Sequence, residues 1–375
     1  MASKNRIRVK KLLLALTSLL LTLFATLLPP SQANDQLSIP AGSQTIQLPA
    51  NAKPNGMTVN IGMLIENIYD VNLANASFLA EGWYWLSWGE DVQAALKRNS
   101  IAPSEIVEFS NEIERGQYFF TESNQDKALL TPSDKYSYQA KFSGKFYIDN
   151  IEQRLAPFDE QKLGISLEVR PLALSTGFDE VTLIPPPIEQ LPIAGEFSGV
   201  DGFRLTNTSW SRQIIRYVTP ASDSISQAVK RQQFSRVTAL FTYTPNTLTV
   251  FLKWLLPIAV VMGIVILAPS INGALGDARL AIPSAALLTL VLLQDAYKTS
   301  FPPAPYLTYL DELYTYSYLV CFAIFLLFLI GTNAHSRASE EDRELVAKRV
   351  NRLDLVVQCI TLIGFLLVAI VGWHI

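Results

Sequence analysis

Apolar and polar positions follow two different patterns along this chain, and the pattern changes near residue 246. Between residues 34 and 246, short runs rich in β-branched and aromatic residues alternate partly with polar ones, which is typical of half-buried strands. Six such runs occupy residues 58–72, 76–88, 137–149, 163–169, 208–219 and 234–244. Turn signals separate them, and residues 90–99 have a helical pattern. Many short strands without alternating helices predict an antiparallel β-sandwich over residues 34–246.

Beyond residue 246 the apolar runs become continuous. Four of them occupy residues 248–268, 280–297, 313–330 and 353–372. Each is close to the roughly 20 residues that a helix needs to cross a bilayer. Pro257 interrupts the first run, which a packed helical bundle tolerates. Residues 247–375 are therefore predicted to form a membrane domain of four helices.

The amino terminus and one loop predict the orientation. Residues 1–33 have a basic front, an apolar core and a small-x-small cleavage site at Ser31-Gln32-Ala33, which predicts a secretory signal. An uncleaved anchor is the alternative, and both export the domain that follows. The basic residues between the third and fourth runs place loop 331–352 in the cytoplasm by the positive-inside rule. These residues are Arg337, Arg343, Lys348, Arg349 and Arg352.

Composition and candidate chemistry narrow the function. The chain has 375 residues, 49% of them hydrophobic and 17% charged, and its net charge of −3 provides no basic field for nucleic acid. Cys321 and Cys359 both lie inside apolar runs, and we expect them to be buried packing residues. The two histidines, His335 and His374, are predicted on opposite sides of the membrane and cannot form a metal site or a triad. We find no catalytic constellation and do not expect an enzyme.

One face of the second apolar run is suited to line a pore. At 3.6 residues per turn, positions 281, 285, 288, 292 and 295 share a face. Several copies around an axis would form rings of Asp277 and Asp295 at the two ends, which favour cations, and a hydrophobic constriction at Leu288 and Leu292. Ala281 and Ala285 make the inner part of this face dry, and Pro283 is expected in the first turn of the helix. Packing between helices is the alternative use of the same face.

Aromatic side chains provide a second candidate site, in the exported domain. Trp83 and Trp85 share one face of a predicted strand, with Tyr84 and Trp88 on the other. A later strand carries two further members, Trp210 and Tyr217. Aromatic rings at a subunit cleft can bind a cationic ligand, which the polar loop 218–231 could cover. The alternative is that these rings fill the core of the sandwich.

The second and third runs are joined by a stiff linker. It contains Pro302, Pro303 and Pro305, followed by Tyr306. The predicted orientation makes this linker external, on the side of the exported domain.

Three segments resemble the pentameric ligand-gated ion channels, the Cys-loop receptor superfamily. Residues 152–161 (EQRLAPFDEQ) resemble the turn of that family between two strands of the sandwich. LKWLLPI at 252–258 is similar to the start of its first membrane helix. The second run, followed by PAPYLTYLDELY at 303–314, resembles its pore helix and the turn that follows. Asp149 and Leu163 stand where animal members carry the bracketing cysteines, so the resemblance is to bacterial members without that disulfide.

The resemblance implies an immunoglobulin-like sandwich of nicotinic-receptor type and a homopentamer around the second run. It also implies a channel without cofactors, in a bacterial inner membrane with its sandwich in the periplasm. A small ligand or protons would open it by binding between neighbouring sandwiches. The junction residues implied by the resemblance are Pro157, Phe158 and Asp159 in the turn, and Lys298, Pro305 and Tyr306 in the linker.

Three points stay open at this stage. Asp159 either pairs with a basic group such as Lys298 or caps its own turn. Cation selectivity is expected, although Ala278 stands where cation-selective relatives usually carry Glu, with Asp277 one residue earlier. A non-conducting oligomeric receptor that signals through loop 336–352 is the alternative to a channel.

Overall fold

A computed structural model describes residues 43–49, 56–115, 119–120, 134–149, 151–170, 181–185, 193–197, 199–200, 202–217, 233–271, 276–338 and 343–374. The predicted signal sequence and loop 218–231 lie outside these residues. The chain forms two compact units. One contains residues 37–152 and 158–246, and the other contains residues 247–375 together with the short segment Gln153–Pro157.

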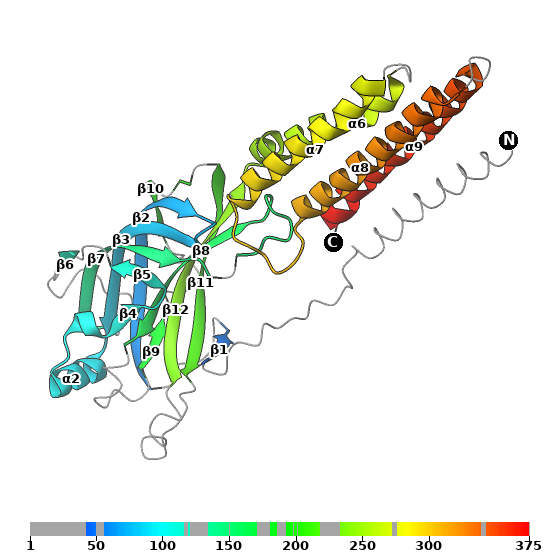
Figure 1. Ribbon diagram of the computed structural model, residues 1–375. Helices are drawn as coiled ribbons and strands as arrows, with labels where there is room; N and C mark the ends of the chain where they lie inside the picture. Colours follow the sequence, from blue (N-terminus) through cyan, green and yellow to red (C-terminus); the bar gives the residue numbers. More distant parts are fainter. Residues whose placement is uncertain are drawn as a thin grey trace. The chain divides into compact units, whose positions relative to one another are not determined.

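The first unit consists of two β-sheets that enclose one core (Figure 1). The strands are β1 (Ser43–Leu48), β2 (Met57–Asn72), β3 (Ser77–Trp88), β4 (Val107–Phe109), β5 (Glu112–Arg115), β6 (Phe119–Phe120), β7 (Tyr136–Tyr147), β8 (Gln161–Val169), β9 (Val181–Ile184), β10 (Ile193–Phe197), β11 (Phe203–Tyr217) and β12 (Gln233–Pro245). One sheet has the order β1-β11-β12-β8-β4. The other has the order β10-β2-β3-β7-β5, with β6 paired to β7 and β9 to β2.

Alternation of apolar side chains along the long strands builds the core of the sandwich. On β3, Tyr84, Leu86 and Trp88 are buried, whereas the alternate residues Trp83 and Trp85 point to the opposite face. The same period places Val237, Ala239, Phe241 and Tyr243 of β12 in the core. All pairings among the long strands β2, β3, β7, β8, β11 and β12 are antiparallel, whereas β9 and β10 pair with β2 in parallel. The two-sheet β fold predicted from the alternation is therefore confirmed.

The short helix of this unit is α2 (Glu90–Asn99), as the pattern predicted, and η1 (Pro103–Glu105) is a single 3₁₀ turn. Acidic residues start α2 and basic residues end it, in agreement with the helix dipole. Its apolar face buries Val92, Ala95 and Leu96. Ser100 follows in the left-handed conformation, which ends the helix.

The second unit is a bundle of long helices. Its helical elements, short turns included, are α5 (Thr247–Val250), η2 (Phe251–Leu255), α6 (Leu256–Leu267), η3 (Ala268–Ser270), α7 (Gly276–Lys298), α8 (Tyr309–Ser336) and α9 (Arg343–His374). Among the residues that the structure describes, four segments are long and apolar enough to cross a membrane. These segments are Thr247–Ser270, Gly276–Lys298, Tyr309–Ala334 and Lys348–Trp373. The expectation of a multi-pass membrane protein is thus supported by four helices of sufficient length.

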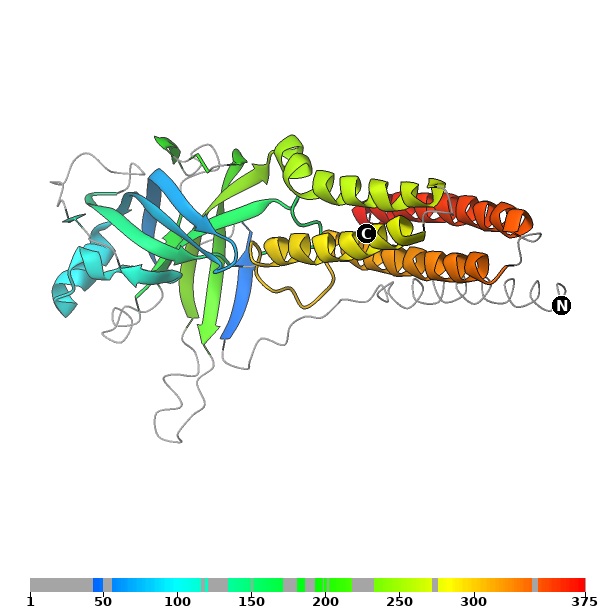
Figure 2. The ribbon, with the colours of Figure 1, turned by 45° about the horizontal axis from the view of Figure 1, so that its top comes forward.

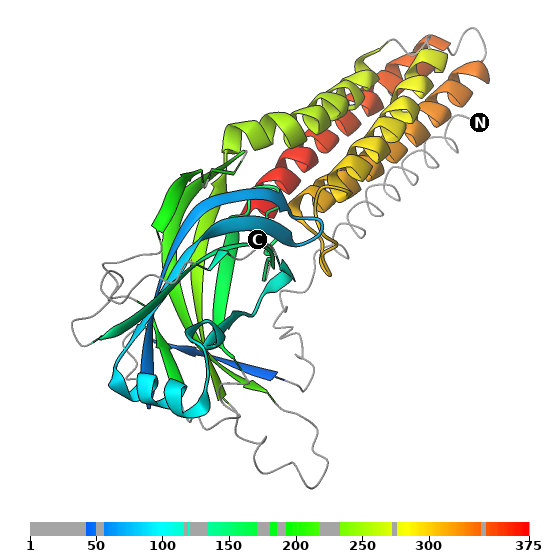
Figure 3. The ribbon, with the colours of Figure 1, turned by 90° about the vertical axis from the view of Figure 1, so that its left-hand side faces the viewer.

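Within the bundle, α7 packs against α6 and α8, and α9 packs against α8 and the segment that includes η3. The carboxyl ends of α6 and α8 and the amino ends of α7 and α9 lie at one end of the bundle, and the α7–α8 linker lies at the other (Figures 2 and 3). α7 is therefore flanked by two helices and keeps one side that no other long helix of the described residues contacts closely.

Two expectations about the helices, for Pro283 and Cys359, need correction, and one feature at Pro257 was not predicted. Pro257 is preceded by one turn of π-helix, η2, in which the N–H of Leu256 bonds the carbonyl of Phe251. α7 begins at Gly276, a full turn before the apolar run, so Pro283 is inside the helix and not in its first turn. Cys321 is buried as expected, but Cys359 is exposed, because an apolar run does not specify which of its faces packs.

Candidate functional site: the uncovered face of α7 and its external linker

The face of α7 predicted to line a pore is the face that the bundle leaves uncovered. Successive residues of a helix are 100° apart, so the residues that share this face are spaced three and four apart. All six predicted members are exposed: Asp277, Ala281, Ala285, Leu288, Leu292 and Asp295. Leu288 and Leu292 are 64% and 63% exposed. The opposite face of α7 is buried and consists of Arg279, Pro283, Ala286, Leu290 and Tyr297.

The exposed face includes two residues that the sequence-based prediction omitted. Ser284 and Val291 are exposed and lie three or four positions from Leu288, on the same stripe. Ser284 donates its hydroxyl proton to the carbonyl of Leu280 at 2.9 Å, and the oxygen remains available as an acceptor. The i, i+3, i+4 series from Asp277 would have identified both residues. The face is therefore less dry than Ala281 and Ala285 alone predicted.

The start of α8 is fixed by a capping box. The backbone N–H of Thr308 bonds the carboxylate of Asp311 at 3.3 Å, and the N–H of Asp311 bonds the hydroxyl of Thr308 at 3.3 Å. This reciprocal pair satisfies donors that a helix amino terminus leaves unpaired. The hydroxyl of Thr308 also bonds the hydroxyl of Tyr297 at 2.7 Å. The cap therefore connects the end of α7 directly to the start of α8.

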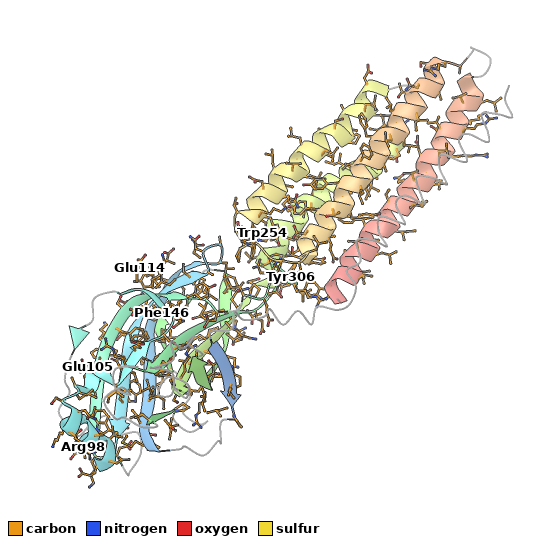
Figure 4. The ribbon with its side chains drawn as sticks, turned by 60° about the horizontal axis from the view of Figure 1, so that its bottom comes forward. Arg98, Glu105, Glu114, Phe146, Trp254 and Tyr306 are labelled. Carbon is orange, nitrogen blue, oxygen red and sulfur yellow. The ribbon has the colours of Figure 1, made fainter. Side chains whose placement is uncertain are left out.

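Aromatic side chains pack around the end of α7 that meets the linker. Trp254 on η2 contacts Tyr297 and Phe301, with ring centroids 5.9 and 6.0 Å apart. Tyr297 and Phe301 are in turn 5.2 Å apart. Figure 4 labels Trp254 and Tyr306 in this part of the bundle. Three segments of the unit, η2, α7 and the linker, are thus joined by one cluster.

A turn from the sandwich sequence belongs to the helical unit. Segment Gln153–Pro157, between β7 and β8, groups with the helices by its contacts. The N–H of Gln153 bonds the hydroxyl oxygen of Tyr306 at 3.2 Å, and the N–H of Tyr309 bonds the carbonyl of Arg154 at 3.0 Å. Two backbone groups of this segment are therefore bonded to the linker and to the first residue of α8.

The other predicted junction residues differ in their exposure. Pro157 is buried in the segment, and Phe158 and Asp159 follow it at intermediate exposure. Lys298 and Pro305 are exposed on the linker side. The pairing of Asp159 with Lys298 stays a prediction.

The predicted ligand-binding tryptophans of β3 lie on the outer face of their sheet. The indole N–H of Trp83 donates to Glu66 at 2.9 Å, and Glu66 pairs with Lys141 at 2.9 Å. The ammonium of Lys141 lies 5.9 Å from the centre of the Trp83 ring. Trp85 covers Gly62 of β2 so closely that a Cβ there would be 2.1 Å from its indole nitrogen. One aromatic face of this set is thus already occupied by a cation of the chain.

The other two predicted ligand-binding residues are on the second sheet. Trp210 pairs with Ala239, which is in the core, and is itself partly buried against that core. Tyr217 ends β11, and its side chain lies outside the described residues. A single chain therefore does not bring Trp83 and Trp210 together on one surface. Whether these rings share a ligand between two chains stays a prediction.

We compared the sequence with known protein families and with curated proteins. No model of a known protein family matches the sequence, and no curated protein matches it.

Proposed function

We propose that this chain is the subunit of a homopentameric ligand-gated ion channel that is selective for cations and lies in a bacterial inner membrane. In this proposal the β-sandwich is of the immunoglobulin-like, nicotinic-receptor type and lies in the periplasm. Catalysis and cofactors have no part in it. The partners are four further copies of the chain, the lipid bilayer, permeating inorganic ions, and a small ligand or protons.

The proposal rests on one observation about α7, which is that the predicted pore-lining face and the exposed face are the same. The stripe selected from sequence spacing as a pore lining is the stripe that no other long helix covers in the part of the chain that the structure describes. It carries acidic side chains at both ends, Asp277 and Asp295, and Leu288 between them. A stripe with carboxylates at both ends is poorly suited to face lipid, because charge in hydrocarbon is costly. Around a symmetry axis it would face water, with Leu288 and Leu292 as the dry constriction.

The linker contacts support a route for gating. A ligand can open a channel only through its different affinities for the closed and open states. Segment Gln153–Pro157 is continuous in sequence with β7 and β8, and its backbone bonds the linker and the first residue of α8. In the proposed mechanism, a movement of the sandwich strands would pull on Tyr306 and, through the capping box at Thr308, on the end of α7.

Reconstitution of Leu288→Ser in liposomes tests the proposal without knowledge of the ligand. A polar side chain at the constriction should hold water and let ions leak, so a trapped ion gradient should collapse faster than with the wild-type chain. The matched control is Ile264→Ser on α6, which is 55% exposed but is not on the α7 stripe. That variant should not leak. Mass measurement of the assembled complex should give five copies.

The alternative is a non-conducting oligomeric receptor that signals through loop 336–352. It predicts no leak from Leu288→Ser in an intact pentamer, and no current from the wild-type chain over a broad screen of pH and small solutes. Both results together would favour the receptor over the channel.

A further inference from the structure

The side of α7 that faces into the bundle carries a charge that the proposed function has not used. Arg279 lies two residues after Asp277, so the two side chains are about 200° apart around the helix. Asp277 is exposed, whereas Arg279 is only 3% exposed. The amino-terminal turn of α7 therefore carries opposite charges on opposite faces.

The buried guanidinium is held by the other helices. Its Nη2 atom donates to the carboxylate of Asp354, on α9, at 2.5 Å. Its central carbon lies 4.1 Å from the ring centre of Phe328, on α8. Asp354 is itself only 2% exposed and lies within the candidate span Lys348–Trp373. A charge at such a position is costly unless it is paired, so each residue accounts for the presence of the other.

Among the described residues, Asp354 is the one hydrogen-bond acceptor for the guanidinium of Arg279. The Nε atom of Arg279 and the second carboxylate oxygen of Asp354 have no hydrogen-bond partner there. The position of the guanidinium thus depends on one ionic hydrogen bond and on the ring face of Phe328. Loss of Asp354 would leave the positive charge uncompensated in the bundle, which is costly, and the carboxylate of Asp277 lies only two residues away on the exposed face of the same helix.

We propose that Asp354 of α9 fixes the ion selectivity of the candidate channel by holding Arg279 inside the bundle, away from the face that carries Asp277. The inference rests on the proposed channel function. With Arg279 withdrawn, each subunit contributes only the negative charge of Asp277 to the inner mouth, and an acidic ring favours cations. With Arg279 released, the two charges at the mouth cancel. Asp354 is thus a positioning residue, which acts on ions through Arg279.

The test compares Asp354→Asn with the double variant Arg279→Gln/Asp354→Asn in bilayers under a salt gradient. All chains carry Leu288→Ser, so that no ligand is needed. In the single variant we expect the cation-to-anion permeability ratio, obtained from the reversal potential, to fall by roughly tenfold. In the double variant no free positive charge remains and Asp277 is intact, so the ratio should return to that of the parent chain. A merely structural role of Asp354 would change yield or thermal stability but not this ratio.

Each outcome decides the matter. An assembled Asp354→Asn pentamer with unchanged selectivity overturns the proposal. If this variant fails to assemble while the double variant assembles and keeps the parent selectivity, Asp354 has only the structural role of compensating Arg279, and the proposal is overturned. If both fail to assemble, the role of Asp354 is independent of Arg279 and the proposal is wrong. A parent chain that passes no current refutes the channel itself, which is a separate result.

Discussion

The backbone N–H of Gln153 donates a hydrogen bond to the hydroxyl oxygen of Tyr306 at 3.2 Å, across 153 positions of the sequence. Gln153 is only 5% exposed, so its N–H has little access to water if this acceptor is removed. Tyr306 follows the three prolines of the linker, which restrict how far it can move on its own. The bond is therefore a specific connection between the β7–β8 turn and the linker.

Tyr306→Phe removes the acceptor and leaves the ring in place. We expect a loss of about 1 kcal/mol in the free energy of unfolding of the helical unit, because a buried N–H is left without its partner. In the Leu288→Ser background the leak current should also change, since the proposed gating route passes through this bond. The measurements are thermal unfolding and liposome flux. Tyr69→Phe, at an exposed tyrosine of β2, is the control and should alter neither quantity.

The capping box at the start of α8 gives a second prediction. Thr308→Ala removes the hydroxyl that accepts from Asp311 N–H and that also bonds Tyr297. Loss of an N-cap costs about 0.5–2 kcal/mol, and the buried Tyr297 hydroxyl loses one of its bonds in addition. Thermal unfolding should therefore show a lower midpoint. Thr308→Ser keeps both bonds and should stay close to wild type, whereas an equal loss in both variants would contradict the role of the cap.

The sequence was sufficient for the long elements and for one face of α7. Alternation predicted the six long strands of the sandwich but not the shorter strands β1, β4, β5, β6, β9 and β10, and the pattern at 90–99 predicted α2 with its observed bounds. The stripe of α7 also followed from spacing, because at 3.6 residues per turn the two acidic residues at its ends, Asp277 and Asp295, lie on the same face of the helix. The bundle leaves that face open. In the proposed oligomer, the exposed face of α7 would be covered by other copies of the chain.

The sequence could not predict contacts between side chains on elements that are far apart along the chain. Arg279 and Asp354 are 75 positions apart, and neither spacing nor composition indicates that they meet. The surroundings of Trp83 depend in the same way on the register of β2, β3 and β7, which places Glu66 and Lys141 beside the ring. By contrast, the Thr308–Asp311 cap is a local sequence motif that a search for capping boxes would have found.

Packing between α8 and α9 gives a third prediction. A Cβ on Gly364 would lie 2.0 Å from the hydroxyl oxygen of Tyr316, which itself bonds the carbonyl of Thr361. Gly364→Ala should therefore separate the two helices or displace the tyrosine, at a cost of about 1–3 kcal/mol for overpacking. Gly263→Ala on α6 is the matched control, because its Cβ would meet nothing within 4 Å.

Thermal unfolding and the yield of assembled protein measure this effect. Gly263→Ala should be neutral or slightly stabilising, since alanine favours helix more than glycine does. Combining Gly364→Ala with Tyr316→Phe should recover part of the loss, because the nearest remaining ring atom is 2.9 Å from the new Cβ. The prediction is wrong if Gly364→Ala and Gly263→Ala behave alike.

The Glu66–Lys141 pair on the outer face of the sandwich predicts a dependence of stability on pH. The hydrogen bond from Lys141 lowers the pKa of Glu66 below its ordinary value of 4.5, and the bond from Trp83 acts in the same direction against the effect of burial. The hydrogen bond to Glu66 raises the pKa of Lys141 above 10.5. A carboxylate with a lowered pKa in the folded state stabilises the fold above its unfolded value, and this contribution is lost as the pH falls through the folded pKa.

The stability difference between wild type and Glu66→Gln should therefore be constant from neutral pH down to about 4.5 and should shrink below it. At the alkaline end, the pair keeps its charges until the pH rises through the raised pKa of Lys141, so the difference should persist up to about 10.5. Tryptophan fluorescence during thermal unfolding is a suitable probe, because the Trp83 indole bonds Glu66 directly. Glu114→Gln, at an exposed carboxylate of β5, is the control, and its difference from wild type should be small at every pH. A difference for Glu66→Gln that does not change between neutral pH and pH 3 would show that the ion pair contributes nothing to folding, and Glu66 would then act on Trp83 only as a neutral acceptor.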